Sequence, residues 1–497
     1  MHSTLLYLSI VSLLALTISA ISRDHSSDRV NYIINCTYNP DTQIIDGEVQ
    51  ILWIKPLEPQ IDELQLHLYL NAFSGPNSTF MKEYGEFPQS IAENPGYCKI
   101  QQIEVNHIDV TQSMKFIQPN DGNKHDSTVV SVPIIHPQRA NTNHTSFRNP
   151  AWVSCKIQFQ SRLPALLERV GVYKDFIMAA QWFPKLGVFE KSSWKCHQFH
   201  ANSEFYANFG TYNITLTLPD SFVVGATGEM IGRKRLPGKQ QQLIFAARKV
   251  HDFAWCADAT IQERILTKFS QSRLSPRTRI RLLYQPEHEG EIAVRIMNAV
   301  HRGLDYFETC YGPYPYPQIT VIDAPLFNAV MEYPTLFLTG NFDGYRNPPA
   351  PAESYPDKNR FLERLTLHEL GHQWFYGVCA NNEAEEAWLD EGLTDYITAK
   401  AFEHLYGKIM QLDEDGNPLP VRDFRKDRYI AKPNVLPSTS KSWEFTTFED
   451  YYIASYVKPK LLFYTLDNML GETMEIIVST FYKRFAYRHP KAEDFFQ

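Results

Sequence analysis

The sequence predicts a multidomain α+β protein in which an all-β N-terminal part precedes a mainly helical part. The chain has 497 residues, and a chain of this length is usually too long to fold around a single hydrophobic core. Short segments of strand-like alternation occupy residues 30–261, whereas from Glu291 the apolar residues recur with helical spacing. We therefore expect a domain boundary near Gln262, with a β-rich domain over residues 21–261 and a second domain over residues 262–497.

The N-terminal part contains six segments that alternate apolar and polar residues and are separated by turn residues. They are "DGEVQILWI", "ELQLHLYL", "TVVSVPII", "WVSCKIQF", "YNITLTL" and "QQLIFAA". A period of two places alternate side chains of a strand on opposite faces, one toward a core and one toward solvent. These segments therefore predict strands of one β-rich domain.

The C-terminal part begins with a helical pattern, since Ile292, Ile296, Val300 and Leu304 follow one another at four-residue spacing. A strand is expected at "QITVIDAP" and another at "PTLFLTG". The proline-rich stretch "NPPAPAESYPDKN" predicts a surface loop before a further helix.

The first 20 residues have the pattern of an export signal. An apolar run from Leu5 to Leu16 ends in the small residues Ser19 and Ala20, and polar residues follow. Because no Lys or Arg precedes the run, an uncleaved membrane anchor is the alternative. No later segment reaches the ~20 apolar residues that span a bilayer. We expect residues 1–20 to be a signal peptide and the protein to be exported, either secreted or periplasmic.

Charge and cysteine content narrow the class of protein. The net charge is −8, and no long run of one sign is present, so nucleic acid is not an expected partner. No C-x-x-C pair occurs, and export would allow one or two disulfides while leaving at least one thiol unpaired. The seven cysteines are Cys36, Cys98, Cys155, Cys196, Cys256, Cys310 and Cys379.

The stretch "LTLHELGHQWFYG" predicts a metal site. On a helix, His368 and His372 lie on one face one turn apart, so both imidazoles can reach one metal ion. Glu369, next to the first histidine, can then take a proton from a metal-bound water. A polar helix that carries H-E-x-x-H by coincidence is the alternative, but such coincidences are rare in a chain of this length.

A catalytic zinc site needs a third protein ligand, and "EEAWLDEGLTDYITAKAF" supplies Glu391, 19 positions after His372. Cys379 is too far from His372 along a helix to share the metal, so we expect it to pack in the core. Most of the neighbouring acids are expected on a solvated loop or helix face, although Asp390 or Asp395 could orient an imidazole. These acids are Glu383, Glu385, Glu386, Asp390 and Asp395.

The spacing H-E-x-x-H-x18-E resembles that of the gluzincin zinc aminopeptidases of the aminopeptidase N family. The family segment W-L-N-E-G, which carries the third ligand, reads Trp388-Leu389-Asp390-Glu391-Gly392 here. The resemblance implies one Zn²⁺ per chain, a saddle-like β domain and a thermolysin-like catalytic domain.

A second segment, "FNAVMEYPTLF", resembles the family's G-x-M-E-N segment, here Ala329-Val330-Met331-Glu332-Tyr333. The resemblance implies that this segment binds substrate and that Glu332 holds the free α-amino group of a peptide. Ala329 stands in place of Gly and could narrow or stiffen this edge together with Val330. The M-E-Y-P sequence, with Tyr333 in place of Asn, resembles a secreted, bacterial-looking branch.

"YIASYVKPKLLFY" resembles the family's Y-x-K-G segment, with Pro459 in place of Gly. The resemblance implies that Tyr456 donates its hydroxyl to the developing oxyanion. Tyr451 and Tyr452 are the alternatives. Other segments, including "QWFPKLGVFE", match the same branch, and Gln181 in it could line the pocket.

The resemblance therefore implies a zinc aminopeptidase acting on peptides with a free N-terminus. The alternatives are a zinc endopeptidase, an epoxide-hydrolysing relative and a member with impaired catalysis. Relatives continue beyond the end of this sequence, so we expect the C-terminal helical domain to be missing and the catalytic domain to be truncated. On that expectation Phe495 and Phe496 would form an exposed apolar patch.

Overall fold

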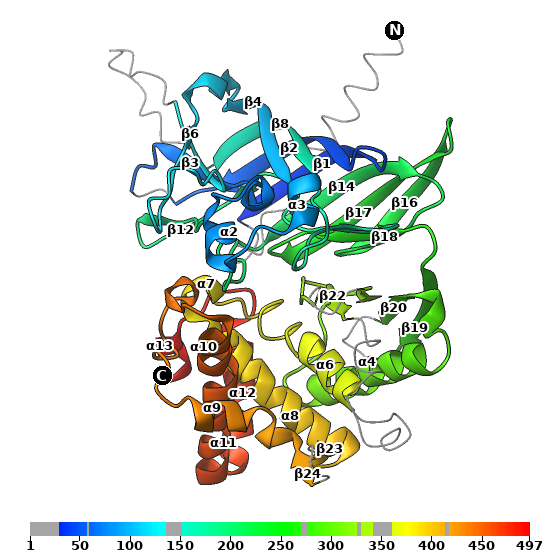
Figure 1. The fold of residues 1–497 in the computed structure, drawn as a ribbon, viewed down its shortest axis with the longest axis vertical. Coiled ribbons are helices and arrows are strands. Elements are labelled where there is room, and N and C mark those ends of the chain that lie inside the picture. The colour runs from blue at the N-terminus through cyan, green and yellow to red at the C-terminus, as the bar shows by residue number, and fades with distance from the viewer. Residues whose placement is uncertain are drawn as a thin grey trace, which may run out of the picture.

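The computed structural model describes residues 29–56, 59–135, 152–269, 277–325, 330–340, 360–412 and 417–497. Figure 1 shows a β-rich part, built from the first half of the chain, lying above a part that is mostly helical. The predicted signal peptide, Ala329 and the proline-rich loop at residues 347–359 lie outside the described residues.

The largest element of the N-terminal part is an eight-stranded sheet. Its strands are β1 (Val30–Asn39), β2 (Ile44–Ile54), β4 (Tyr97–Val105), β5 (Ile108–Asp109), β8 (Trp152–Arg162), β14 (Gly210–Pro219), β16 (Glu229–Leu236) and β17 (Gln240–Val250). They lie in the order β16-β17-β14-β1-β2-β8-β4-β5. Only β1 and β14 of the adjacent pairs are parallel. Strict alternation of buried and exposed residues along β1 shows that one face covers a core.

Smaller sheets lie against the buried face of this large sheet. Their strands are β3 (Glu63–His67), β6 (Lys115–Phe116), β7 (Val129–Pro133), β9 (Gly171–Tyr173), β10 (Phe176–Ala179), β11 (Lys185–Leu186), β12 (Val188–Glu190), β13 (Ser193–Lys195), β15 (Val223–Ala226) and β18 (Trp255–Asp258). They form β15-β18-β10-β9, β11-β3-β7-β6 and β12-β13. Edge-on ring contacts such as Tyr38 with Trp255, at 5.7 Å between centroids, join the layers.

Short helices connect these strands. They are η1 (Tyr69–Phe73), α2 (Thr79–Tyr84), α3 (Gln89–Glu93) and η2 (Thr111–Ser113). Each of the six segments predicted as strands contains a strand in the structure, which confirms the expected β-rich N-terminal part. The boundary near Gln262 stays a prediction.

A mixed sheet opens the C-terminal part. It consists of β19 (Gln262–Lys268), β20 (Thr278–Tyr284), β21 (Gln318–Asp323) and β22 (Leu336–Thr339), in that order. The strands at "QITVIDAP" and "PTLFLTG" are confirmed as β21 and β22. The sequence analysis left β19 and β20 unassigned. β20 alternates charged with apolar residues in "TRIRLLY", so a period-two signal was present there, whereas "QERILTK" of β19 has no such alternation.

The helical remainder follows as a series of short and medium elements. They are η3 (Pro286–His288), α4 (Glu291–Cys310), α6 (Phe361–Gly371), α7 (Glu383–Ala387), η6 (Trp388–Gly392), α8 (Leu393–Tyr406), η7 (Val421–Asp423), α9 (Lys426–Ala431), η8 (Ser442–Glu444), α10 (Phe448–Tyr452), η9 (Ile453–Val457), α11 (Lys458–Leu470), α12 (Glu472–Phe485) and α13 (Ala492–Phe495). A small hairpin, β23 (Ile409–Leu412) and β24 (Pro418–Pro420), interrupts them. The segments η6 and η9 are single turns of π-helix.

Helix α4 supports helix α6, which carries the predicted metal ligands. The predicted apolar stripe of α4, from Ile292 to Leu304, is buried. At Gly303 the two helices approach closely, since a Cβ there would lie 2.6 Å from side-chain atoms of Leu367 and Leu370. Every residue of α6 is buried, so its histidines have fixed positions.

The two parts of the chain are joined by hydrogen bonds between buried groups. His251 Nε2 donates to the carbonyl of Tyr376 at 2.9 Å, and the Gly228 amide donates to the Thr335 hydroxyl at 2.7 Å. Tyr316 donates its hydroxyl to the carbonyl of Lys249 at 2.6 Å. Because each bond pairs a group from one part with a group from the other, the parts hold a defined relative position.

The end of the chain differs in part from the expected exposed patch. Phe495 is only 7% exposed, and its ring packs against Phe463 and Phe481. The expectation was therefore wrong for Phe495, because helices α11 and α12 of this part supply a surface that covers it. Phe496 is 64% exposed, as expected, with one face stacked on Trp388.

All seven cysteines lie in described segments and are free thiols. Six are buried, including Cys379, for which a packing role was predicted, and Cys310 is half-buried. Among the described residues, no helix combines the length and the apolar character needed to cross a membrane.

We expect acid to weaken the junction between the two parts through His251. Burial lowers the pKa of His251 to about 3, so the unfolded chain takes up a proton below pH 6.5 and the folded chain does not. Stability should therefore fall as the pH falls, by about 2 kcal/mol from this residue at pH 5. Urea unfolding between pH 7 and pH 4.5 measures the slope.

The variant His251→Gln keeps an N–H donor for the Tyr376 carbonyl but cannot take up a proton. It should therefore lose less stability than the wild type over the same pH range. An identical pH slope in the two proteins would contradict this account.

Candidate metal centre and active site

Helix α6 presents two imidazoles to one point. His368 is near its end and His372 is its C-terminal cap, still in the αR conformation, so the four-residue spacing keeps both on one face. Their Nε2 atoms lie 3.1 Å apart. Both side chains are buried, His368 being 6% and His372 1% exposed.

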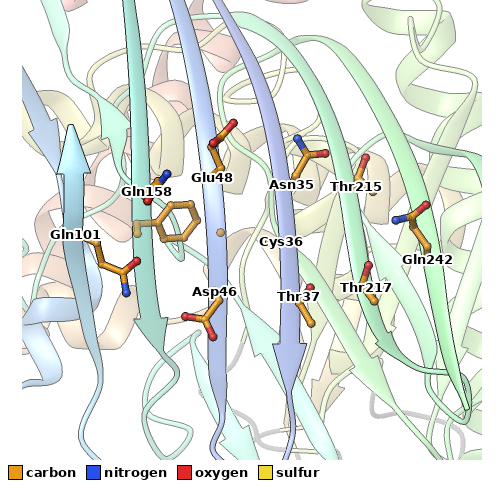
Figure 2. Close-up of a pocket in the computed structure, with 12 residues that line it drawn as sticks. Asn35, Cys36, Thr37, Asp46, Glu48, Gln101, Gln158, Thr215, Thr217 and Gln242 are labelled. Atoms are coloured by element: carbon orange, nitrogen blue, oxygen red, sulfur yellow. The ribbon is translucent and has the colours of Figure 1, made fainter. Parts of the chain in front are cut away.

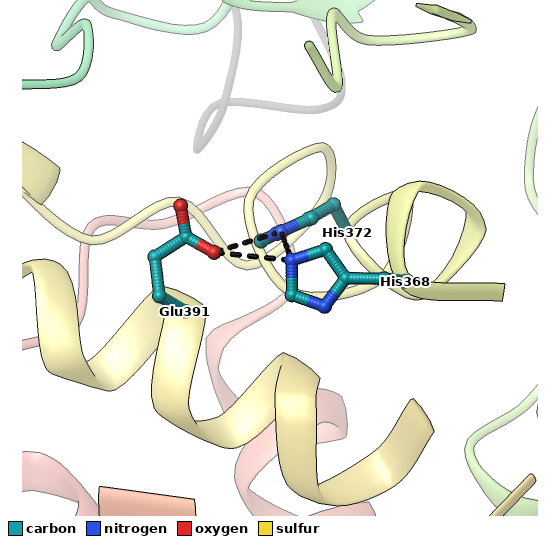
Figure 3. A group of neighbouring side chains, drawn as sticks. All are labelled: His368, His372 and Glu391. Carbon is teal, nitrogen blue, oxygen red and sulfur yellow. Dashed lines mark hydrogen bonds and ion pairs between the residues drawn. The ribbon is translucent and has the colours of Figure 1, made fainter. Parts of the chain in front are cut away.

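Glu391 completes a triangle of candidate ligand atoms. Its Oε2 lies 3.2 Å from the Nε2 atoms of both His368 and His372 (Figure 3). Glu391 is on the π-helical turn η6 rather than on a regular α-helix. Such turns insert one extra residue and re-aim a side chain, and they recur at functional sites.

The protonation of the two histidines fits a metal ion. His372 Nδ1 lies 3.0 Å from Asp390 Oδ1, and His368 Nδ1 lies 3.2 Å from Asp395 Oδ1. Each carboxylate favours the tautomer with the proton on Nδ1, which leaves the Nε2 lone pair free. Two lone pairs and a carboxylate then face one point at 3.1–3.2 Å from one another. Tetrahedral zinc with ligand distances of about 2.0–2.1 Å needs a similar spacing.

The acids near the centre correct one expectation. We expected most of them on a solvated face, but Glu383 and Asp390 are 0% exposed and Asp395 is 1% exposed. Only Glu385 and Glu386 are partly exposed. These acids are close together in the sequence. Only the packing around helices α7 and α8 decides that Glu383, Asp390 and Asp395 point into the core.

Asp395 forms ion pairs with two cationic side chains in addition to its contact with His368. Arg364 donates to its Oδ1 in a short contact, and Lys460 Nζ lies 3.5 Å from its Oδ2. The Arg364 and Lys460 charges keep the pKa of Asp395 well below its usual range in spite of burial. This carboxylate therefore stays ionised and can fix the orientation of the His368 ring.

Glu369 lies beside the centre as a candidate base. It is 3% exposed, and its Oε2 has no hydrogen-bond partner among the described residues. Burial raises the pKa of Glu369 to about 8, and the neighbouring charge of Glu332 adds to this effect. A free, buried carboxyl oxygen at this place can exchange a proton with a water molecule.

Tyr456 reaches the centre from the second π-helical turn, η9. Its hydroxyl donates to Glu391 Oε1 in a short contact, and its ring stacks on Tyr452 at 4.7 Å between centroids. The turns η6 and η9 meet at Gly392, where a Cβ would lie 3.0 Å from the Ser455 carbonyl oxygen and 2.4 Å from Cβ of Pro459 at the start of α11. Pro459 stands near the start of α11 directly after η9, a position that tolerates the missing N–H.

The segment resembling G-x-M-E-N lies along the same centre. Glu332 Oε1 is 3.9 Å from His372 Nε2 and has no hydrogen-bond partner in the described part of the chain. The Met331 carbonyl accepts the Leu338 amide at 2.9 Å, which pairs the segment with β22. Val330 is half-buried, and Tyr333, in place of the family's Asn, is fully buried.

Three further residues lie beside the metal centre and were not predicted there from the sequence. Glu204 comes from the loop between β13 and β14 of the N-terminal part, and Glu383 begins α7. Oxygens of Glu204, Glu332 and Glu383 all lie within 4.8 Å of one another. Arg169 contacts Glu204 in a short ion pair and donates to Met331 Sδ at 2.9 Å. No spacing rule links these residues, so the sequence contained no signal that could have grouped them.

Gln181 does not join this group. Its Nε2 donates to Asp252 Oδ2 at 2.5 Å, next to the buried pair of Asp252 with Lys185. The amide is therefore used inside the N-terminal part, and a pocket role for Gln181 stays a prediction without support from these contacts.

A separate hollow of about 430 Å³ lies on the large sheet. Figure 2 shows that polar side chains of neighbouring strands point into it, among them Asn35, Glu48 and Gln158. None of the metal-centre residues lines it. The hollow lies on the large sheet of the N-terminal part, and it is not part of the candidate active site.

Comparison with known proteins agrees with this geometry. Residues 295–497 match the family model described as Peptidase family M1 domain. Glutamyl aminopeptidase of Sus scrofa is 26% identical over 223 residues, which are 43% of this chain and 22% of the relative. Aminopeptidase Q of Felis catus is 23% identical over 184 residues, or 36% and 18%. The matched part thus spans about a fifth of the length of these curated relatives.

Two solved structures share the fold over nearly the whole chain. The M1 zinc metallopeptidase from Deinococcus radiodurans has a TM-score of 0.59 at 15% identity and covers 94% of this chain and 89% of that one. Legionella pneumophila aminopeptidase A, in complex with aspartic acid, has a TM-score of 0.60 at 14% identity and covers 95% and 48%. These likenesses confirm the predicted α+β fold class.

The C-terminal part therefore combines the fold of the solved zinc metallopeptidase with a two-histidine, one-glutamate centre that could hold a zinc ion. More particularly, residues 295–497 are similar to the peptidase family M1 domain, and the curated relatives named above are aminopeptidases. The secreted branch indicated by M-E-Y-P stays a prediction.

We expect the metal to depend on the ligands and not on the adjacent base. His368→Ala removes an imidazole of the triangle and should abolish stoichiometric zinc, whereas Glu369→Gln replaces a carboxylate outside the triangle by an amide and should leave the zinc in place. Elemental analysis of both purified variants measures this, with circular dichroism to show that each is folded. Zinc loss in a folded Glu369→Gln protein would contradict the assigned positions.

Proposed function

We propose that this protein is a zinc-dependent aminopeptidase that hydrolyses the N-terminal peptide bond of peptides or proteins. The observation that carries the proposal is the buried Oε1 of Glu332, which has no hydrogen-bond partner among the described residues and lies 3.9 Å from Nε2 of the metal ligand His372. An anionic group at this place can hold an ammonium ion, and the first peptide carbonyl of such a substrate then falls at the metal centre.

The residues of the chain have distinct tasks in the proposed reaction. His368, His372 and Glu391 would hold the zinc, which supplies Lewis-acid activation of water and carbonyl when bound. Glu369 would take the proton of the attacking water and pass it to the leaving amine, because its free oxygen lies in the buried centre.

Tyr456 would donate its hydroxyl to the oxygen on which negative charge develops. In the structure this hydroxyl donates to Glu391 Oε1. It would therefore need only a small reorientation to donate to a new acceptor at the same centre. The hydrogen bond from such a donor becomes stronger as negative charge develops on the accepting oxygen. It therefore lowers the activation free energy of the chemical step rather than the KM.

We also propose that the protein acts outside the cytoplasm. The supporting observation is the apolar run from Leu5 to Leu16, which ends in small residues as an export signal does. Sequencing the N-terminus of the protein recovered from its native source tests this proposal.

The test of the aminopeptidase proposal compares an alanyl reporter substrate with its N-acetylalanyl counterpart. Acetylation removes the positive charge that Glu332 would bind, so we expect cleavage of the free form alone. Equal cleavage of both forms would contradict the proposal and favour an endopeptidase.

The variant Glu332→Ala should raise KM for the alanyl substrate while the protein keeps its zinc and its melting temperature. A loss of about ten-fold or more in kcat/KM is expected from one charge-assisted hydrogen bond.

Removing the hydroxyl of Tyr456 should slow the chemical step. For Tyr456→Phe we expect kcat to fall by about 10²-fold with zinc content unchanged, as for the loss of one oxyanion donor. Tyr452→Phe is the matched comparison, because this ring stacks on Tyr456. Full activity of Tyr456→Phe together with loss in Tyr452→Phe would reassign the donor.

A further inference from the structure

Two N-x-T triplets of the sequence lie on neighbouring strands of the large sheet. They are "NCT" at residues 35–37 in β1 and "NIT" at residues 213–215 in β14. Such a triplet is the acceptor signal for N-linked glycosylation, but it also occurs by chance in many chains. Of the two other N-x-S/T triplets, residues 143–145 lie outside the described residues and residues 77–79 have a buried threonine. The positions of the first two in the fold add evidence that the sequence lacks.

Both strand triplets turn their acceptor asparagine and their threonine toward solvent. Residues i and i+2 of a strand share a face, so the two functional positions of each triplet point the same way. Asn35, Thr37 and Asn213 are exposed and Thr215 is half-buried, whereas the middle residue of each triplet is buried. A register shift of one residue would turn both asparagines into the core. The observed register instead lets the fold accommodate a sugar on either asparagine.

The amides of Asn35 and Asn213 have no structural task in the described part of the chain. Neither side chain forms a hydrogen bond with another described residue. Asn71 shows the contrast, since its Nδ2 donates to the Ser127 carbonyl at 2.8 Å and its Oδ1 accepts the Cys98 amide at 2.8 Å. A substituent on Nδ2 of Asn35 or Asn213 therefore breaks no contact of this fold, whereas a substituent on Asn71 would.

The register of the sheet places apolar side chains directly beside the two triplets. Asn35 pairs with Thr215, and Ile33 pairs with Asn213, on strands about 4.8 Å apart. Ile244 of β17 is opposite Thr215. Ile33 and Ile244 are each 38% exposed. A sugar attached to this face would lie over these two side chains and reduce their contact with water.

The hollow on the large sheet offers space for the first sugar on Asn35. Asn35 and Gln158 both line it (Figure 2), and its volume of about 430 Å³ is in the range of small-molecule sites. Asn, Gln and Thr side chains make up most of the lining. The Glu48 carboxylate at its edge is already paired with Lys156 at 2.9 Å. A lining of amides and hydroxyls suits the hydroxyl groups of a neutral sugar.

We propose that Asn35 and Asn213 carry N-linked glycans and that the first sugar on Asn35 lies in the hollow of the large sheet. The proposal rests on the proposed action outside the cytoplasm, because the chain meets the oligosaccharide donor on the secretory route. It makes the outer face of β1 and β14 a modified surface, separate from the metal centre.

The modification is a group transfer from a lipid-linked oligosaccharide diphosphate. A bond forms between Nδ2 of the asparagine and the anomeric carbon of the first sugar. The bond from this carbon to the diphosphate breaks, and the lipid diphosphate leaves with its electron pair. Nδ2 loses one proton, which passes to a base of the transferase and then to water. No oxidation or reduction takes place.

The first experiment uses the protein recovered from its native source. A peptide N-glycosidase removes N-linked glycans and converts each glycosylated asparagine to aspartate, which peptide mass spectrometry detects. We expect the conversions Asn35→Asp and Asn213→Asp after treatment and neither of them before it. The same samples show whether the protein was recovered from outside the cytoplasm.

Variants of the full chain, produced in a eukaryotic secretory host, test the two sites one at a time. Thr37→Ala and Thr215→Ala keep the asparagine and destroy the signal, so each should lose one glycan and one step of mass. Thr37→Ser keeps the signal and should keep the glycan. Asn31→Gln is the matched control, because Asn31 lies on the same face of β1 without a triplet, and this variant should retain both glycans.

The rate of glycan release tests the position of the first sugar. In the folded protein, the glycosidase should release the glycan from Asn35 several-fold more slowly than from Asn213, since only Asn35 lines the hollow. After unfolding, the two rates should become equal. Equal rates in the folded protein would overturn the placement in the hollow.

Other outcomes would overturn the modification itself. Protein recovered outside the cytoplasm with unmodified Asn35 and Asn213 would refute the glycans and leave the export proposal intact. Protein retained in the cytoplasm with both residues unmodified would refute both proposals. A glycan that persists on Asn35 in Thr37→Ala would show that this triplet is not the signal. None of these measurements needs turnover, so a failure of the aminopeptidase function would be seen separately.

Discussion

A buried excess of carboxylate groups is the constraint on which this active site depends. Glu332, Glu369 and Glu383 have oxygens without hydrogen-bond partners in the described structure, within a core that excludes water. Buried carboxylates of this kind persist only when cations or protons compensate them. A zinc ion at the histidines and the substrate ammonium group proposed to bind Glu332 would be two such cations.

Placement of these groups depends on irregular helix geometry. Glu391 and Tyr456 both lie on π-helical turns, and these turns contact each other where Gly392 lies against the Ser455 carbonyl. A side chain larger than glycine would separate them and move the tyrosine hydroxyl away from the glutamate. The two π-turns bring an acid ligand and a hydroxyl donor to one point.

Both parts of the chain contribute to the substrate end of the site. Glu204 and Arg169 belong to the β-rich part, whereas Glu332, Glu383 and the metal ligands belong to the other. The hydrogen bonds of His251 with Tyr376 and of Gly228 with Thr335 fix the position of one part relative to the other. The proposed recognition of a substrate amine would therefore depend on this junction, whereas the metal triangle is formed by helix α6 with its C-terminal cap and by the turn η6.

The sequence by itself determined the features that depend on local periodicity. The strands β2 and β14, the helix α4 and the pair His368 and His372 are all readable because a period of two or of 3.6 residues decides which side chains share a face. Glu391 could be predicted as the third ligand from the number of residues that separate it from His372 in the sequence. Only the tertiary structure decided that Glu383 and Asp390 are buried rather than solvated, and that Glu204 joins Glu332. Contacts between loops and helix ends far apart in the chain have no period, so their charges looked like ordinary surface until packing enclosed them.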